Sequence, residues 1–183
     1  MAAMGSRAAG TGSAAAAPVR IRVLAEDIDV GELERWLQRE DGGVGAIVSF
    51  TGYVRGRGAG GDIQRLWLEH YPGMTERAIG AIVAEATRRW ALHAVAVLHR
   101  VGELGPGARI VYVGVASAHR GDAFAACEFI MDYLKTRAPF WKKECSGREE
   151  RWVEPRDSDE AALRRWGAPG GGSGRPDAAE GSA

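Results

Sequence analysis

An almost wholly apolar segment stands near the middle of the chain: Arg109-Ile110-Val111-Tyr112-Val113-Gly114-Val115-Ala116. Its β-branched and aromatic residues favour a strand, and the lack of polar alternation indicates that both faces are covered, so we expect it at the centre of a sheet. Residues 95–101 predict a second strand, and Gly105-Pro106-Gly107 between the two has the composition of a turn. This hairpin-like pair argues against a purely parallel, doubly wound sheet.

Further strands and helices surround this pair. Helical periodicity is clearest over residues 79–90, where apolar side chains recur on one helix face. Pro139 predicts the end of a later helix, because proline disfavours helical geometry in the residue before it. In chain order we expect a strand over 19–24, a helix capped by Asp29, a strand over 44–54, a mobile glycine-rich loop over 55–61, a strand over 63–70, a helix capped by Thr75, the two central strands, a helix capped by Asp122, a connecting segment, a short strand over 151–153 and a helix from Asp157 to Trp166. This order indicates an α+β fold.

The composition is that of a globular protein with low-complexity ends. Of 183 residues, 24 are Lys or Arg and 24 are Asp or Glu, and zero net charge removes the electrostatic case for a general nucleic-acid or membrane-surface binder. Glycine and alanine concentrate at both ends, so we expect disordered tails at 1–18 and 167–183 around one domain at 19–166.

No stretch approaches 18 consecutive apolar residues, and no secretory signal is evident. Two cysteines without metal-site spacing favour a reducing, cytoplasmic environment.

The most unusual segment surrounds Pro139: Lys135-Thr136-Arg137-Ala138-Pro139-Phe140-Trp141-Lys142-Lys143-Glu144. Lys135 lies on the last helical turn, whereas Lys142 follows the break and can fold back toward it. Two ammonium groups that converge on one site depress each other's pKa, and aromatic walls desolvate them. A lysine in this setting can act as a nucleophile or as an acid–base group near neutral pH. A solvated basic helix end is the competing interpretation, since cations favour a helix C-terminus.

Two other segments are candidate anion sites. His119 and Arg120 join the central strand to a helix N-terminus, where a phosphate can bind, although a polar loop with a satisfied histidine is equally compatible. Arg55 can clamp an anion in front of the glycine-rich loop, the alternative being a disordered connector. Residues to which we assign no chemistry are His70, His93 and His99, interpreted as structural, Cys127, interpreted as core, and Cys145, expected to be exposed.

Several of these segments together resemble one family, the large, catalytic subunit of molybdopterin synthase. The resemblance rests on residues 44–55, 68–75, 99–104, 117–120 and 129–144 and extends from about Val19 to Trp166. The run from Lys135 to Lys142, with the sequence KTRAPFWK, is the most specific of these segments. The resemblance implies an α/β hammerhead-like fold of the α+β class with an additional small antiparallel β subdomain.

The resemblance also implies a sulfurtransferase of molybdenum cofactor biosynthesis. In the family, a ubiquitin-like small subunit carries a thiocarboxylate at its C-terminus, and this tail enters a pocket of the large subunit. Two sulfurs pass in successive steps to cyclic pyranopterin monophosphate, which becomes molybdopterin. The sulfur arrives on the partner, so no catalytic cysteine is needed in this chain. We also expect no metal and no cofactor. Two large subunits form a central homodimer within a heterotetramer.

Carried onto this chain, the resemblance implies Lys135 and Lys142 as catalytic residues, with Lys142 nearest the thiocarboxylate and Lys135 nearest the pterin. The residues are compatible both with a covalent role of a lysine at the partner's carboxyl carbon and with proton transfer alone. The implied substrate-binding residues are Arg55, His119, Arg120, Lys135, Lys142, Lys143 and Glu144.

Two hypotheses from other classes compete with this one. The interleaved cations, Phe140 and Trp141 could stack the bases of single-stranded RNA. Alternatively, the chain is a non-catalytic scaffold that only docks a ubiquitin-like tail. Zero net charge already weakens the first of these.

Overall fold

The computed structural model describes residues 16–39, 42–58, 61–146, 149–153 and 162–167. Almost all of the two expected tails lies outside these residues, as do Asp157 and Glu160 of the last predicted helix. The elements are β1 (Val19–Leu24), α1 (Val30–Gln38), β2 (Ala46–Tyr53), β3 (Arg57–Gly58), β4 (Gly61–Asp62), β5 (Arg65–His70), α2 (Met74–Arg89), β6 (Leu92–Arg100), β7 (Gly102–Leu104), β8 (Arg109–Ser117), α3 (Arg120–Arg137), β9 (Phe140–Ser146) and β10 (Glu149–Trp152).

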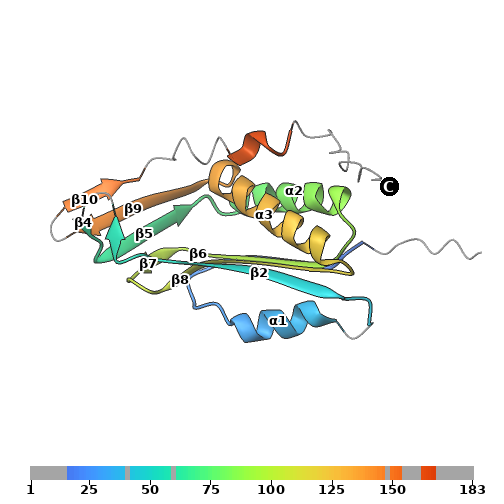
Figure 1. The fold of residues 1–183 in the computed structure, drawn as a ribbon. Coiled ribbons are helices and arrows are strands. Elements are labelled where there is room, and N and C mark those ends of the chain that lie inside the picture. The colour runs from blue at the N-terminus through green and yellow to red at the C-terminus, as the bar shows by residue number, and fades with distance from the viewer. Residues whose placement is uncertain (1–15, 40–41, 59–60, 147–148, 154–161, 168–183) are drawn as a thin grey trace, which may run out of the picture.

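The larger sheet has the strand order β1-β6-β8-β2 and confirms the predicted central strand. β8 occupies an inner position, and its residues from Val111 to Ser117 are all buried. β6 and β8 are antiparallel, as the hairpin-like pattern indicated, and β1 pairs parallel with β6. In Figure 1, α2 and α3 cover one face of this sheet and α1 covers the other.

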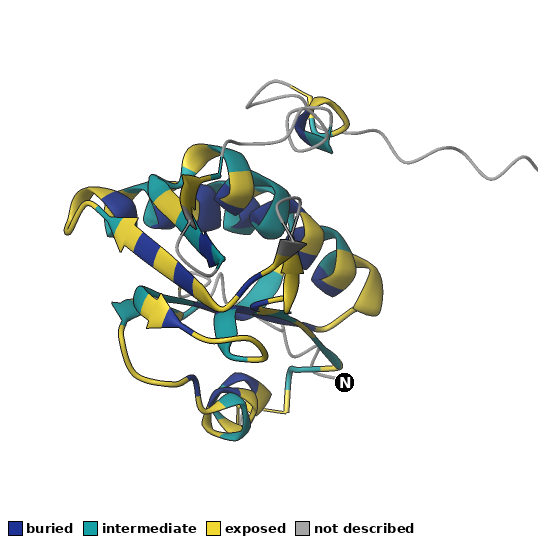
Figure 2. Ribbon diagram, turned by 90° about the vertical axis from the view of Figure 1, so that its left-hand side faces the viewer, coloured by how far each residue is buried: buried dark blue, intermediate teal, exposed yellow. Residues whose placement is uncertain are grey.

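The side chains of the inner strands alternate between two cores. One core joins Val95, Val97, Val111, Val113 and Val115 to α2 and α3, and the other joins Ala94, Ala96, Leu98, Tyr112 and Ala116 to α1. Figure 2 shows α1, below the sheet, with its buried residues on the side that faces the sheet. Gly114 lets this helix approach, because a Cβ there would collide with the side chains of Leu37 and Tyr112.

The N-cap residue predicted from the sequence is confirmed for one helix and is wrong for two. Asp29 caps α1, and its side chain accepts a hydrogen bond from the Glu32 amide at 2.9 Å. Thr75, expected as a cap, lies inside α2, which is preceded by Gly73 at φ 78°, a conformation that glycine adopts without strain. Asp122, also expected as a cap, lies in the first turn of α3, whose N-cap is His119.

The smaller sheet, β10-β9-β5-β7, is antiparallel throughout and forms the expected additional β subdomain. Two predictions were wrong here. The segment after Pro139, expected to be a connection, is the strand β9, which pairs with β5 from Phe140 to Cys145. Part of the predicted mobile loop is a short ladder between β3 and β4, with Arg57 and Asp62 in an ion pair of 3.1 Å.

The described C-terminal residues pack on α2 and α3. Residues 162–164 form a helical turn, which lies within the predicted last helix. The ring of Trp166 contacts Trp90 and Phe129 edge-on, with centroids 5.9 and 5.4 Å apart. Its indole N–H donates to Asp132 at 2.8 Å.

Candidate active site

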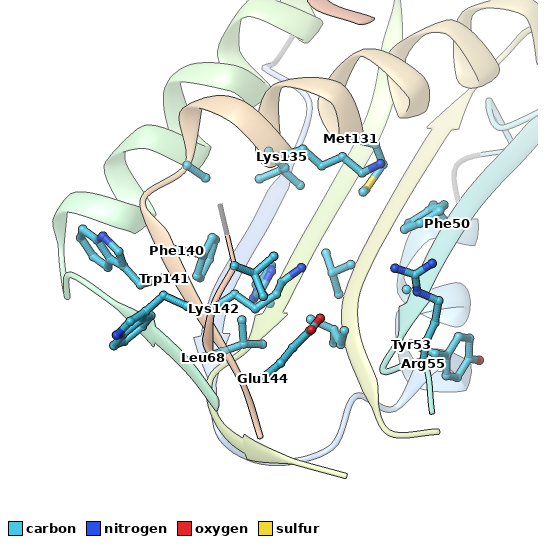
Figure 3. A pocket seen from close by; sticks show the side chains of 18 residues that line it. Phe50, Tyr53, Arg55, Leu68, Met131, Lys135, Phe140, Trp141, Lys142 and Glu144 are labelled. Carbon is cyan, nitrogen blue, oxygen red and sulfur yellow. The ribbon is translucent and has the colours of Figure 1, made fainter. Parts of the chain in front are cut away.

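The bend at Pro139 brings Lys135 and Lys142 to one cavity. α3 ends at Arg137, and Ala138 already has extended backbone angles, φ −86° and ψ 127°. Lys135 reaches the cavity from the last turn of α3, and Lys142 reaches it from β9. Figure 3 shows both side chains at the same hollow. The sequence-based expectation that the chain folds back at the proline is confirmed.

This cavity, of about 720 Å³, lies where α3 and the two sheets meet, a size ordinary for a small-molecule site. Its charged lining consists of Arg55, Lys135, Lys142 and Glu144, so three cations face one carboxylate. In Figure 3, Arg55 and Lys142 enter from opposite sides. The remaining described lining residues are Phe50, Gly52, Tyr53, Leu68, His99, Ile110, Val111, Met131, Leu134, Ala138, Phe140, Trp141, Trp152 and Val153. Low-polarity walls strengthen the attraction of such cations for an anion.

Arg55 follows Val54, a residue that two backbone hydrogen bonds hold at the end of β2. The amide of Val54 donates to the carbonyl of Ala108 at 2.9 Å, and the amide of Gly107 donates to the carbonyl of Val54 at 2.9 Å. The predicted turn at Gly105-Pro106-Gly107 thereby fixes the residue before Arg55. The arginine therefore extends from an ordered support and not from a disordered connector.

Lys143 does not line the cavity, although its neighbours Lys142 and Glu144 do. Successive residues of a strand point to opposite faces, and the ammonium group of Lys143 pairs with Glu150 at 2.7 Å. This hydrogen bond raises the pKa of Lys143 and lowers the pKa of Glu150. Lys143 also lies over the ring of Trp152, 5.6 Å from its centroid. Its role in substrate binding stays a prediction.

His119 and Arg120 lie at the far end of α3 from Lys135. The helix advances 15 residues from Arg120 to Lys135, or about 22 Å at 1.5 Å per residue. Neither residue is among those that line the cavity. A single chain thus does not unite these two residues with the lysines.

His99, interpreted from the sequence as a structural residue, lines the cavity. Its ring stacks on Phe140 with centroids 3.7 Å apart, and Nδ1–H donates to the carbonyl of Arg100 at 2.8 Å. Burial lowers the pKa of His99 to about 4, and the nearby charge of Lys142 acts in the same direction. The ring is therefore neutral at pH 7, with Nε2 as an acceptor.

The stacking on His99 also bears on the RNA hypothesis. One face of the Phe140 ring is covered by the imidazole, so that face is not available to stack on a base. Trp141 is 47% exposed, but it follows Phe140 directly in β9, and successive side chains of a strand point to opposite faces, so the two rings do not lie side by side as a platform for bases.

The two cysteines are free thiols, and both are buried. Cys127 belongs to the core, as predicted, and burial raises the pKa of its thiol to about 11. The expectation that Cys145 is exposed was wrong, because its strand lies between β5 and β10 and its thiol approaches Glu150 at 3.9 Å. Neither thiol lines the cavity.

Within the described part of the chain, no three His, Cys, Asp or Glu side chains gather as they would around a metal ion. Among the same residues, no helix has the length and apolar character that crossing a membrane requires.

The fold and cavity define an α+β protein with a pocket in which three of the four charged described lining residues are cations. Residues 23–137 match the model of the MoaE protein family. The chain is 58% identical over 147 residues to the molybdopterin synthase catalytic subunit of Yersinia pestis, covering 80% of this chain and 97% of that one. It is 55% identical over 150 residues to the subunit of the same name from Escherichia coli, covering 82% and 99%. The molybdopterin cofactor biosynthesis protein E structure from Burkholderia multivorans has 51% identity and a TM-score of 0.69, covering 82% and 97%. The chain belongs to the MoaE family.

Proposed function

We propose that this chain is the catalytic subunit of a molybdopterin synthase. It converts cyclic pyranopterin monophosphate to molybdopterin with two sulfurs from the thiocarboxylated C-terminus of a ubiquitin-like small subunit. The observation that carries this proposal is the convergence of Lys135 and Lys142, from a helix and a strand, on one cavity. Both free thiols fit a reducing compartment, and on that basis we place the reaction in the cytoplasm.

The charges of the cavity fit two anionic reactants that must meet. A phosphate and a thiocarboxylate repel each other in solution, and the three cations offset this repulsion where water is partly excluded. In the proposal, Lys142 receives the thiocarboxylate of the partner and Lys135 receives the pterin. Arg55 faces them from the other side, and Glu144 is the one carboxylate among the described lining residues.

In this proposal, the homodimer expected from the family completes each active site with residues from a second copy of the chain. His119 and Arg120 are about 22 Å from Lys135 along α3, so they reach the phosphate of the same substrate only from a second copy of the chain. Each cavity of the dimer would then combine the two lysines of one copy with His119 and Arg120 of the other. One small subunit at each outer end completes the heterotetramer.

Substitution of Lys142 tests the function. With the thiocarboxylated small subunit and cyclic pyranopterin monophosphate, Lys142→Ala is expected to remain folded and to form no product, measured as fluorescence after oxidation. Lys142→Arg keeps the positive charge but cannot release a proton or act as an amine nucleophile, so it separates charge from chemistry. Arg88→Ala removes an exposed cation on α2 and serves as the control.

Single-turnover measurements separate an enzyme from a scaffold. A scaffold that only docks the tail would bind the small subunit without consuming its thiocarboxylate. Normal product formation by Lys142→Ala would contradict the proposed site.

A further inference from the structure

The bend between the two lysines is a short piece of backbone that sets where both amines lie. Ala138 leaves the helix, and the amide of Phe140 donates back to the carbonyl of Ala138 at 2.9 Å. This closes a three-residue turn around Pro139. A change in the backbone angles here would move Lys142 relative to Lys135. The contacts that hold the turn therefore determine the geometry of the site.

Thr75 contacts this turn from a distant part of the chain. Its side-chain hydroxyl donates to the carbonyl of Pro139 at 3.2 Å. The same oxygen accepts a hydrogen bond from the amide of Tyr71, also at 3.2 Å. Proline has no N–H, so the carbonyl is the only hydrogen-bonding group by which Pro139 itself can be held.

The Thr75 hydroxyl is neither part of the cavity lining nor the N-cap of α2, so another role must explain its bond to Pro139. Thr75 is fully buried, and a buried hydroxyl is costly unless it is hydrogen-bonded. It does not line the cavity, and it is not the cap of α2, since Gly73 holds that position. The start of α2 uses the contact with Tyr71, whereas the bond to Pro139 joins the helix to a residue 64 positions away.

The far side of the turn is fixed as well. The ring of Phe140 lies on His99, with an interplanar angle of 17°. His99 is itself hydrogen-bonded to the carbonyl of Arg100. The turn is thus held on two sides. Thr75 of α2 binds it through a hydrogen bond, and His99 of β6 packs on it through ring stacking.

We propose that Thr75 is a positioning residue for the lysine pair, because its hydroxyl fixes the carbonyl of Pro139 and so the angle at which β9 leaves α3. This inference rests on the proposed function. Thr75 touches no substrate and acts through the turn. A displacement of about 1 Å at reacting groups is enough to lower a rate about 100-fold.

Two substitutions of Thr75 separate its hydroxyl from its shape. Thr75→Val keeps the branched shape and removes the hydroxyl, whereas Thr75→Ser keeps the hydroxyl and removes a methyl group. Each full-length variant is assayed with the thiocarboxylated small subunit and cyclic pyranopterin monophosphate in single turnover, at a temperature where circular dichroism shows it folded. If Thr75→Val does not fold, Thr75→Ala removes the same hydroxyl and carries the same expectation.

The expected result is a loss of about 10- to 100-fold in the rate constant for Thr75→Val at saturating partner, with the affinity for the partner unchanged. Thr75→Ser is expected to stay within about threefold of the unsubstituted protein. Equal rates for Thr75→Val and the unsubstituted protein, even with a lower melting temperature, would show a purely structural role and overturn the inference. Equal losses in both variants would assign the effect to the methyl group and overturn it too. If the unsubstituted protein itself forms no product, it is the proposed function that fails.

Discussion

Acidification is expected to weaken the fold through one imidazole, that of His99. Burial at the cavity is the largest cause that disfavours a second proton on this ring, and the charge of Lys142 acts in the same direction, whereas the hydrogen bond to the carbonyl of Arg100 offsets part of the effect. An exposed histidine in the unfolded chain takes up that proton near pH 6.5. The unfolded state therefore binds more protons than the folded state whenever the pH lies between the two pKa values.

The magnitude follows from these two pKa values. Above pH 7 the ring is neutral in both states, so it contributes nothing to the pH dependence of the free energy of unfolding. As the pH falls through 6.5 only the unfolded state is protonated, and the loss is complete near pH 4, where the folded state also titrates. The interval from 6.5 to about 4 corresponds to about 3.4 kcal/mol in full, of which about 2 kcal/mol is lost by pH 5.

Urea unfolding at pH 7.5 and pH 5.0 measures this effect. His99→Gln cannot titrate, so its free energy of unfolding should fall between these pH values by about 2 kcal/mol less than that of the unsubstituted protein. His93→Gln, outside the cavity, controls for the removal of one histidine. The comparison uses the change with pH, so a lower stability of His99→Gln at pH 7.5 does not affect it. Equal losses in the unsubstituted protein and His99→Gln would refute the reasoning.

Two further predictions concern packing and assembly. Gly114→Ala places a Cβ 2.7 Å from the ring of Tyr112 and should lower the free energy of unfolding in urea by about 1–3 kcal/mol. Gly121→Ala, with open space around it in α3, should leave that free energy unchanged or raise it by up to about 1 kcal/mol, and similar losses in both variants would contradict the packing argument. Arg120→Ala and Lys142→Ala should each be inactive in the product fluorescence assay, but unfolding and refolding them as a mixture should restore about a quarter of the normal activity, since half of the dimers are mixed and each has one intact site. No recovery would exclude sites shared between two copies.

Much of the larger sheet could be predicted, because its residues carry a strong local signal. The run from Ile110 to Ala116 is apolar on both faces, and in the structure each face meets a helix layer. The proline after α3 marked the bend correctly, since its effect on the preceding residue is local. The meeting of Lys135 and Lys142 depends on that bend and could be inferred with it.

The features that were missed depend on partners distant in the sequence. β9 has no apolar alternation, because Lys142 and Glu144 face a cavity instead of a core, and its pairing with β5 leaves no pattern in the residues. His99 lies near the end of β6, and its place at the site depends on Phe140 and Lys142, which the fold brings to it. The burial of Cys145 likewise results from the strands on either side of it.

The positions of His119 and Arg120 show a different limit of prediction from the sequence. Their position at the start of α3 was expected, and the structure has His119 at the N-cap. Sequence motifs, however, do not tell whether two functional segments meet within one copy or across two. The length of α3 supplies that information, because it keeps Arg120 and Lys135 about 22 Å apart.

The alternation along β9 constrains how this segment can change in evolution. One inserted or deleted residue between Pro139 and Lys142 would turn the lysine to the face now occupied by Lys143. Two inserted residues would restore the face but displace the amine by about 7 Å along the strand. Exchanges of one amino acid for another can accumulate in this stretch, whereas a change in its length removes the lysine from the cavity. Related sequences are therefore expected to align here without gaps, even where they have diverged on both sides.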